Sequence, residues 1–233
     1  MNQDYMYTSE LPVGNLPNLY ILADGMGGHN AGDYASHYTV EMMVRSVRAS
    51  QESSPVSILR SAISEANLAV VQQAGMHIDL EGMGTTVVAA TCIAGELCVA
   101  NVGDSRLYIA GDGLKQITKD HSYVQEMVRS GELSPEVARV HPDRNIITRA
   151  VGGGTEIEID FFEVELKENE RILMCSDGLT DMLEDREIFK IIEERKDTQS
   201  IVDELVIMAN EHGGNDNITV ILTDPFAEDA DWR

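Results

Sequence analysis

Three short apolar segments in the middle of the chain are joined by links of only a few residues. They are residues 85–91 (TTVVAAT), 97–102 (LCVANV) and 106–110 (RLYIA), and glycine-containing turns separate them. Parallel strands need a crossover of a dozen residues or more, so links this short allow only antiparallel neighbours. We therefore predict an antiparallel meander over these residues.

The remaining secondary structure is predicted in clusters, with strands grouped together and helices in pairs. Further β-branched, apolar runs predict strands at residues 19–23, 157–166, 171–175 and 217–222. Helical spacing of apolar residues predicts long helices at residues 31–49, 55–74 and 197–212, and shorter ones at 123–130, 134–140 and 185–194. This order favours an α+β fold over alternating βαβ units.

The length and the cysteine pattern suit one reduced, soluble domain. A chain of 233 residues is of single-domain size, and we assign residues 1–224 to the domain and 225–233 to an acidic tail. No apolar run approaches a membrane span, and the first residues lack a signal-peptide pattern. Cys92, Cys98 and Cys175 lie in apolar segments without metal-ligand spacing, so we expect buried thiols in a cytoplasmic protein.

The charge of the chain restricts its partners. Forty acidic residues stand against 17 basic ones, and the net charge is −23. Nucleic acid and anionic membranes would be repelled, so we expect neither as a partner. A phosphate ester would be repelled as well, so an enzyme acting on one would need bound cations.

Four aspartates stand where apolar strands begin or end. Asp24 follows residues 19–23, Asp104 and Asp177 each follow a strand after one small residue, and Asp216 precedes residues 217–222. Carboxylates that converge at strand ends repel one another and lose hydration unless a cation satisfies them. Such oxygen ligands select magnesium, manganese or calcium over zinc or copper.

An Asp-Gly pair can also be nothing more than a hairpin turn. Asp112-Gly113, between residues 106–110 and the apolar segment that follows, is predicted to be one. Asp24-Gly25 and Asp177-Gly178 would deserve the same interpretation if either stood alone. The glycine-rich stretch after Asp24 and the helical character after Asp177 favour a site instead. The six histidines show no zinc-binding spacing, and His29 and His121 are the least certain of them.

Eight short motifs occur in order along the chain and together resemble one protein family. They are Asn2-Gln3-Asp4, ADGMGGHNAG (23–32), GMGTT (82–86), VGDSRLY (102–108), DHS (120–122), ITRAVG (147–152), CSDGL (175–179) and GGNDNIT (213–219). This series resembles the bacterial branch of the PPM family, the type 2C protein serine/threonine phosphatases. The resemblance covers residues 2–223. It implies a β-sandwich of two antiparallel sheets flanked by helix pairs, a four-layer α-β-β-α fold.

The resemblance also implies a metal centre that contains two catalytic Mn²⁺ or Mg²⁺ ions. Asp24 would bridge the ions, with the backbone carbonyl of Gly25 on one of them. Asp177 and Asp216 would ligate the other ion, and Asp4 would hold metal-bound water.

Further roles are implied around this centre. Asp104, with Asp177, would form a third metal site, and Asn217 would orient the neighbouring carboxylate. Asp24, Asp177 and Asp216 are therefore the implied catalytic residues, acting through a metal-bridged hydroxide that attacks phosphorus. Cys175 would be core and not a nucleophile. The implied partners are phosphoproteins and a cognate serine/threonine kinase, and we expect a monomer.

Several features depart from the family pattern or are open to a second interpretation. Met26 replaces a histidine that could act as general acid, so metal-bound water would supply the proton, with His29 as a less favoured substitute. No residue matches the phosphate-binding arginine and first strand that precede the Asn-Gln-Asp motif, which predicts weaker phosphate binding.

Two alternatives to a protein phosphatase follow. One is a catalytically weak binding protein that keeps the fold, and the other is a hydrolase of small phosphate esters. Residues 122–144 match the family's flap, which is either a determinant of substrate choice or an ordinary helical insertion.

Overall fold

A computed structural model describes residues 2–28, 31–195 and 197–227. Its strands are β1 (Asp4–Ser9), β2 (Leu19–Met26), β3 (Gly84–Thr85), β4 (Val87–Ile93), β5 (Glu96–Val102), β6 (Arg106–Ala110), β7 (Leu114–Gln116), β8 (Asp160–Glu165), β9 (Arg171–Cys175) and β10 (Val220–Thr223). Its helices are α1 (Ala31–Ala49), α2 (Pro55–Met76), α3 (Tyr123–Ser130), α4 (Pro135–Arg139), α5 (Asp177–Thr180), α6 (Asp185–Glu194) and α7 (Thr198–Glu211), with a short 3₁₀ helix η1 (Ile78–Leu80).

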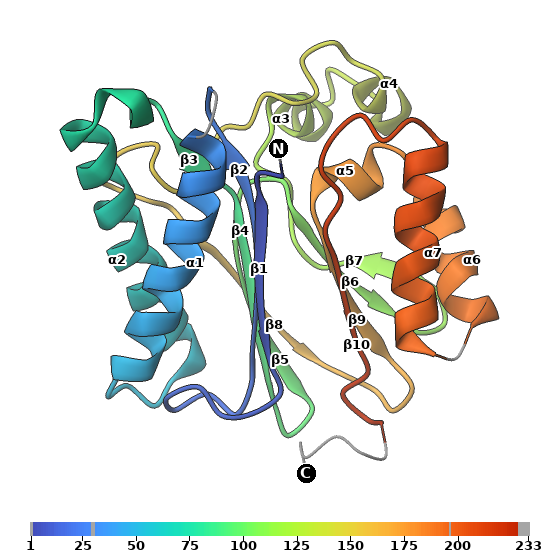
Figure 1. Ribbon diagram of the computed structural model, residues 1–233. Helices are drawn as coiled ribbons and strands as arrows, with labels where there is room; N and C mark the ends of the chain where they lie inside the picture. The colour runs from blue at the N-terminus through green and yellow to red at the C-terminus, as the bar shows by residue number, and fades with distance from the viewer. Residues whose placement is uncertain (1, 29–30, 196, 228–233) are drawn as a thin grey trace.

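The strands form two antiparallel sheets. One has the order β1-β2-β4-β5-β8, with β3 paired to β2, and the other has the order β10-β9-β6-β7. Figure 1 shows α1 and α2 outside the first sheet and α6 and α7 outside the second. The layers are therefore helix, sheet, sheet, helix, which confirms the predicted fold class.

Three apolar clusters hold the layers together. The first packs α1 and α2 against one face of the first sheet, with Met43, Ile63 and Val87 fully buried. The second fills the space between the sheets, and the third joins the second sheet to α5, α6 and α7. Alternation along β4 explains this division, since successive side chains of a strand point to opposite faces. Cys175 is fully buried in the third cluster, as predicted.

The predicted three-stranded meander is wrong in its last step. The Ala94-Gly95 turn has φ angles of 51° and 86°, and it joins β4 and β5 as a tight hairpin. By contrast, β6 pairs with β7 and β9 in the other sheet. Packed sheets lie about 10 Å apart, and three extended residues span about that distance. Residues 103–105 therefore carry the chain across the sandwich.

Most predicted elements are present, but the β1 strand was not predicted. Helices α1, α3 and α6 have the predicted bounds, and α2 and α7 differ from them by at most two residues at an end. The strand predicted at residues 85–91 is split at Thr86 into β3 and β4. The sequence of β1 does not alternate between apolar and polar residues, because Tyr5 and Met6 lie on opposite faces of the strand and are both exposed. None of the helices in the described ranges is long and apolar enough to span a membrane.

Candidate metal centre

Asp4 and Asp24 are brought together by the pairing of β1 with β2. They are direct cross-strand partners, and the N–H of Gly25 donates to the carbonyl of Gln3 at 3.0 Å. Asp4 is 7% exposed, and its Oδ2 accepts a hydrogen bond of 2.9 Å from the Ser176 hydroxyl. Ser176 precedes α5 in the layer of the second sheet, so this bond crosses the sandwich. The side chains of Asp4 and Asp24 are themselves in hydrogen-bond contact.

The glycines that follow Asp24 and Asp177 permit close backbone contacts and do not form turns. A Cβ atom on Gly25 would lie 2.0 Å from the carbonyl oxygen of Gly32, and one on Gly178 would lie 2.0 Å from that of Asn217. Asp24-Gly25 lies inside β2, and Asp177-Gly178 opens α5. The hairpin interpretation is therefore wrong for both pairs. It is confirmed for Asp112-Gly113, which joins the antiparallel strands β6 and β7.

Asp177 and Asp104 approach the same region from the second sheet and from the crossing between sheets. Asp177 follows β9, and its side chain is in hydrogen-bond contact with Asp24. Asp104 lies on the link from β5 to β6 and is 8% exposed. The charge of Asp177 is the largest electrostatic influence on Asp104, so the two carboxylates are neighbours.

Asp216 lies at the exposed rim of this cluster. Its charge acts on both Asp4 and Asp177. Its Oδ1 accepts a hydrogen bond of 2.7 Å from the backbone N–H of Asn217. The Asn217 side chain does not contact Asp216. Its Oδ1 instead accepts a hydrogen bond of 2.7 Å from the backbone N–H of Gln3. Asn217 therefore joins the start of β1 to the segment before β10. Its backbone N–H, and not its side-chain amide, contacts Asp216.

Burial and mutual repulsion raise the pKa values of four carboxyl groups, those of Asp4, Asp24, Asp104 and Asp177. Loss of hydration is the first cause in each case. Neighbouring carboxylates add to it, and the pKa rises to about 10 for Asp24, about 8 for Asp104 and about 6 for Asp177. The pKa of Asp4 is raised as well. Without a cation, the cluster would hold protons near neutral pH.

The residues fit a site for hard divalent cations. Asp4 Oδ1 and Asp177 Oδ1 are buried and have no hydrogen-bond partner among the described residues. The candidate ligands are all oxygen atoms, which suit magnesium, manganese or calcium. Across the described ranges, no three Asp, Glu, His or Cys side chains already surround a single ion position.

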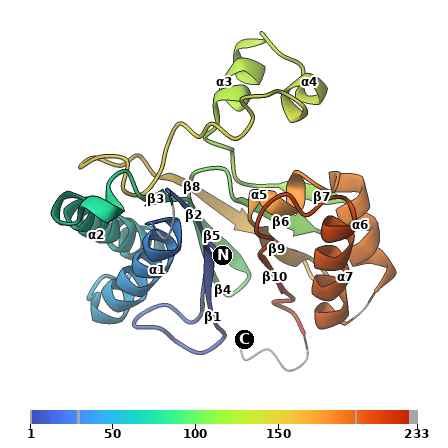
Figure 2. The same cartoon turned by 45° about the horizontal axis from the view of Figure 1, so that its top comes forward.

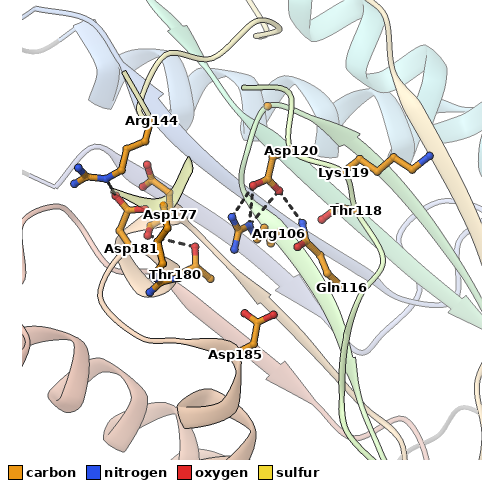
Figure 3. Close-up of polar contacts among 12 residues, drawn as sticks. Arg106, Gln116, Thr118, Lys119, Asp120, Arg144, Asp177, Thr180, Asp181 and Asp185 are labelled. Atoms are coloured by element: carbon orange, nitrogen blue, oxygen red, sulfur yellow. Dashed lines mark hydrogen bonds and ion pairs between the residues drawn. The ribbon is translucent and has the colours of Figure 1, made fainter. Parts of the chain in front are cut away.

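A second buried carboxylate nearby is neutralised by the protein itself. Asp120 receives hydrogen bonds from Arg106 Nε at 2.9 Å and Nη2 at 2.6 Å, and from Gln116 Nε2 at 2.7 Å (Figure 3). Arg106 Nη1 also donates to the Tyr108 hydroxyl at 3.0 Å. The sequence pattern predicted no role for this pair, although Arg106 lies in the VGDSRLY motif and Asp120 in the DHS motif.

His121 is a structural residue that supports the crossing loop. Its Nδ1 accepts from the N–H of Gly103 at 3.1 Å, and its backbone N–H donates to the Gly103 carbonyl at 2.9 Å. An Asp160 carboxylate oxygen lies 3.2 Å from Nε2 of His121. Burial nevertheless lowers the pKa of the His121 imidazole. His29, the predicted substitute for a general acid, lies outside the described residues. Met26 is half-buried in β2 and has no proton to donate.

A cleft of about 840 Å³ opens next to the centre. Asp104 and Asp177 line its inner end, and α3 and α4 line its outer wall. Figure 2 shows this helical segment standing apart from both helix layers. Arg144, which follows α4, binds Asp181 through Nε at 3.1 Å, and the two side chains meet beside Asp177 in Figure 3. The flap predicted at residues 122–144 therefore borders the candidate centre.

Known proteins share this fold and much of this sequence. A family profile described as Protein phosphatase 2C matches residues 1–223. The serine/threonine phosphatase stp of Listeria monocytogenes is 41% identical over 211 residues, which cover 88% of this chain and 84% of that protein.

Solved structures agree with this similarity. The crystal structure of serine/threonine phosphatase Stp1 from Staphylococcus aureus has a TM-score of 0.89 and 34% identity, covering 95% of this chain and 88% of that one. The catalytic domain of the phosphatase PstP, solved in complex with two manganese ions, has a TM-score of 0.84 and 34% identity. It covers 96% of this chain and 91% of that one.

Proposed function

The chain belongs to the protein phosphatase 2C family, and on that premise we propose that it hydrolyses phosphoserine and phosphothreonine on proteins with divalent cations. The observation that carries the proposal is the pair of buried, unpartnered oxygens, Asp4 Oδ1 and Asp177 Oδ1. They belong to a cluster of carboxylates that no lysine or arginine among the described residues neutralises by an ion pair. A cluster of this kind is costly unless cations occupy it.

Each carboxylate has a distinct place in the proposed centre. Asp24 contacts both Asp4 and Asp177, so it is proposed as the carboxylate that two bound cations would share. The Gly25 carbonyl, Asp177 and Asp216 are proposed as further ligands, and Asp4 as the acceptor that orients a coordinated water. Asp104 with Asp177 is proposed to hold a third ion at the inner end of the cleft.

Manganese or magnesium bound here would lower the pKa of coordinated water and neutralise the phosphoryl oxygens. The protein contributes positioning. Ser176 fixes Asp4 by a hydrogen bond, and the hydroxyl of Thr86 accepts from the backbone N–H of Asp24 at 3.0 Å. The thiol of Cys175 is fully buried, and burial raises its pKa to about 12, so it takes no part as a nucleophile.

The wider setting is also proposed from the family. Relatives named as serine/threonine phosphatases and a complete set of carboxylates favour catalysis over a binding protein that has lost turnover. We place the chain in the cytoplasm, as a monomer that opposes a serine/threonine kinase on shared phosphoproteins.

Manganese-dependent hydrolysis of a phosphothreonine peptide tests the proposal. Asp177→Asn should abolish turnover and weaken manganese binding measured by calorimetry, because it removes a charged ligand from the cluster. Asp112→Asn is the matched control, since it changes an exposed aspartate of another Asp-Gly pair. Equal turnover in Asp177→Asn and Asp112→Asn, or full turnover in EDTA, would refute a metal mechanism.

A further inference from the structure

A groove lies between β1 and α1, on the outer side of the first sheet. Its volume is about 530 Å³. The side chains that line it are apolar, aromatic or cationic apart from one glutamate: Tyr5, Tyr7, His37, Val40, Glu41, Val44, Arg45, Arg48 and Ala49. The ring of Tyr5 packs on that of His37 with centroids 4.4 Å apart, which forms one end of the groove.

The two arginines of the groove are available to a partner. Arg45 and Arg48 are exposed and lie one turn apart on α1. The hydrogen bonds and ion pairs found among the described residues involve neither guanidinium, and Glu41, though one turn away, does not pair with Arg45. Most other arginines of the described chain are engaged, for example Arg106 with Asp120 and Arg144 with Asp181.

The charge of the groove is opposite to that of the rest of the molecule. The chain as a whole carries −23, and the cleft next to the candidate metal centre has seven carboxylates against three arginines. The groove has two arginines against one glutamate. An acidic segment would be repelled from most of the surface and attracted here, so charge complementarity selects an acidic occupant.

The backbone of β1 also favours an extended occupant. It is the edge strand of its sheet, paired on one side with β2. Residues of an antiparallel strand bond alternately to the two sides, and Gln3 bonds to Gly25 of β2. By this alternation the backbone groups of Met6 and Thr8 face outward, where an added strand could bond to them. Alternate side chains of such a strand would face α1, as Tyr5 and Tyr7 do.

We propose that this groove docks an acidic, extended segment of the phosphoprotein substrate, with its carboxylates on Arg45 and Arg48. The identity of the occupant as substrate rests on the proposed function. Continuity with the metal centre supports it, because the groove begins at Tyr5, the residue after Asp4. A substrate held here lies along the same strand that presents Asp4 to the centre.

The test uses a fluorescein-labelled octapeptide of alternating glutamate and valine, with anisotropy as the readout. The variant Arg45→Glu with Arg48→Glu should bind it roughly tenfold more weakly, the size expected for two exposed charge-pair contacts and their reversal. The matched control is Arg186→Glu with Lys190→Glu, on exposed positions of α6, which changes the net charge equally. A peptide of alternating glutamine and valine should bind neither variant nor the native chain.

Phosphopeptides that carry the acidic or the neutral extension then link docking to turnover. The native chain and the α6 control should prefer the acidic extension in kcat/KM, and the Arg45 and Arg48 variant should lose this preference. Equal binding losses in both charge variants, or no preference in the native chain, would overturn the proposal.

Two further measurements distinguish a substrate groove from a dimer interface and separate docking from catalysis. A native chain that elutes as a dimer, and as a monomer after the groove substitutions, would overturn the proposal by placing a second copy in the groove. Hydrolysis of p-nitrophenyl phosphate by the native chain with manganese checks the proposed function separately. If that reaction fails while the acidic peptide still binds, the docking site stands and the catalytic assignment does not.

Discussion

Two groups of buried or half-buried carboxylates lie in the same part of this molecule and differ in their neighbours. Asp120 is met by Arg106, which donates to both of its oxygens, and by Gln116. Asp4, Asp24 and Asp177 contact one another, and two of their oxygens have no partner among the described residues.

The contrast distinguishes an aspartate that stabilises the fold from aspartates that are candidates to bind a ligand. A buried carboxylate is stable when a guanidinium compensates for its lost hydration. Arg106 does this for Asp120, which therefore needs no external cation. The carboxylates around Asp24 have no guanidinium partner among the described residues, and the proposed cations would compensate for their lost hydration. Both groups contain aspartates after or before strands, so the difference lies in the neighbours and not in the residue type.

The largest expected effect comes from removing the Asp24 carboxylate, which separates the two groups in both activity and stability. Asp24→Asn should lower kcat for a phosphothreonine peptide by at least about 10³-fold, since it removes the carboxylate central to the metal centre. In EDTA near neutral pH the same change should stabilise the fold by at least roughly 1–3 kcal/mol, because folding no longer requires the Asp24 carboxyl group to take up a proton. Chemical denaturation in EDTA measures the second effect. A less stable variant would show that Asp24 is satisfied within the protein.

Removing the Arg106 guanidinium should lower the stability of the fold, because Asp120 then loses its cation. Arg106→Met leaves Asp120 without its cation and should cost about 2–4 kcal/mol in unfolding free energy, less than for a fully buried pair. The discount reflects the side-chain exposure of Arg106, which is 25%. The loss should be equal with manganese and with EDTA. A loss that manganese reverses would mean that Asp120 belongs to the metal centre.

The metal-free cluster should make stability depend on pH in an unusual direction. The folded-state pKa values of Asp177, Asp104 and Asp24 are raised to about 6, 8 and 10, above the values of the unfolded chain. The folded state then binds more protons, so this stability is present at low pH and lost as the pH rises through those values. In EDTA the unfolding free energy should fall steeply from about pH 5 to about pH 9, since each group contributes about 1.4 kcal/mol per pH unit below its folded-state pKa.

Manganese should reverse that trend, because a bound cation favours the ionised carboxylates. Asp112→Asn, which removes an exposed carboxylate outside the cluster, should keep the same slope in EDTA and serves as the control. A flat profile in EDTA for the native chain would argue that Asp24 and its neighbours are not coupled as described.

The smallest expected effect concerns the support of the centre. Asn217→Ala removes the acceptor for the N–H of Gln3 and loosens the start of β1, where Asp4 lies. Manganese affinity measured by calorimetry should weaken roughly tenfold, as for other groups that orient ligands. Asn215→Ala, an exposed neighbour, is the control. Equal affinities in the two variants would exclude a positioning role for Asn217.

Much of this molecule follows from local patterns in the chain. Helices α1, α3 and α6 have their predicted bounds because amphipathic spacing, caps and glycines are local signals. The aspartates at strand ends marked the candidate centre for the same reason, since a strand end is local. The Ala94-Gly95 hairpin was also predictable, because its turn is short and its strands are continuous.

Other features depended on residues far apart in the chain. The crossing at residues 103–105 has the length of a hairpin link, and only the partners of β6 show which sheet it joins. The strand β1 is exposed on parts of both faces, so its apolar alternation is weak. The Arg106–Asp120 pair joins two motifs that no local rule connects.

The sequence by itself determined the class of fold and showed which aspartates stand at strand ends, as candidate oxygen ligands. These depend on periodicity and residue type, which the chain carries locally. Only the tertiary structure decided which carboxylates meet each other, which meets an arginine, and which arginines of the described chain stand unpaired on a basic groove. Those outcomes are set by long-range packing, because burial and charge pairing exist only once the two sheets and their helices have assembled.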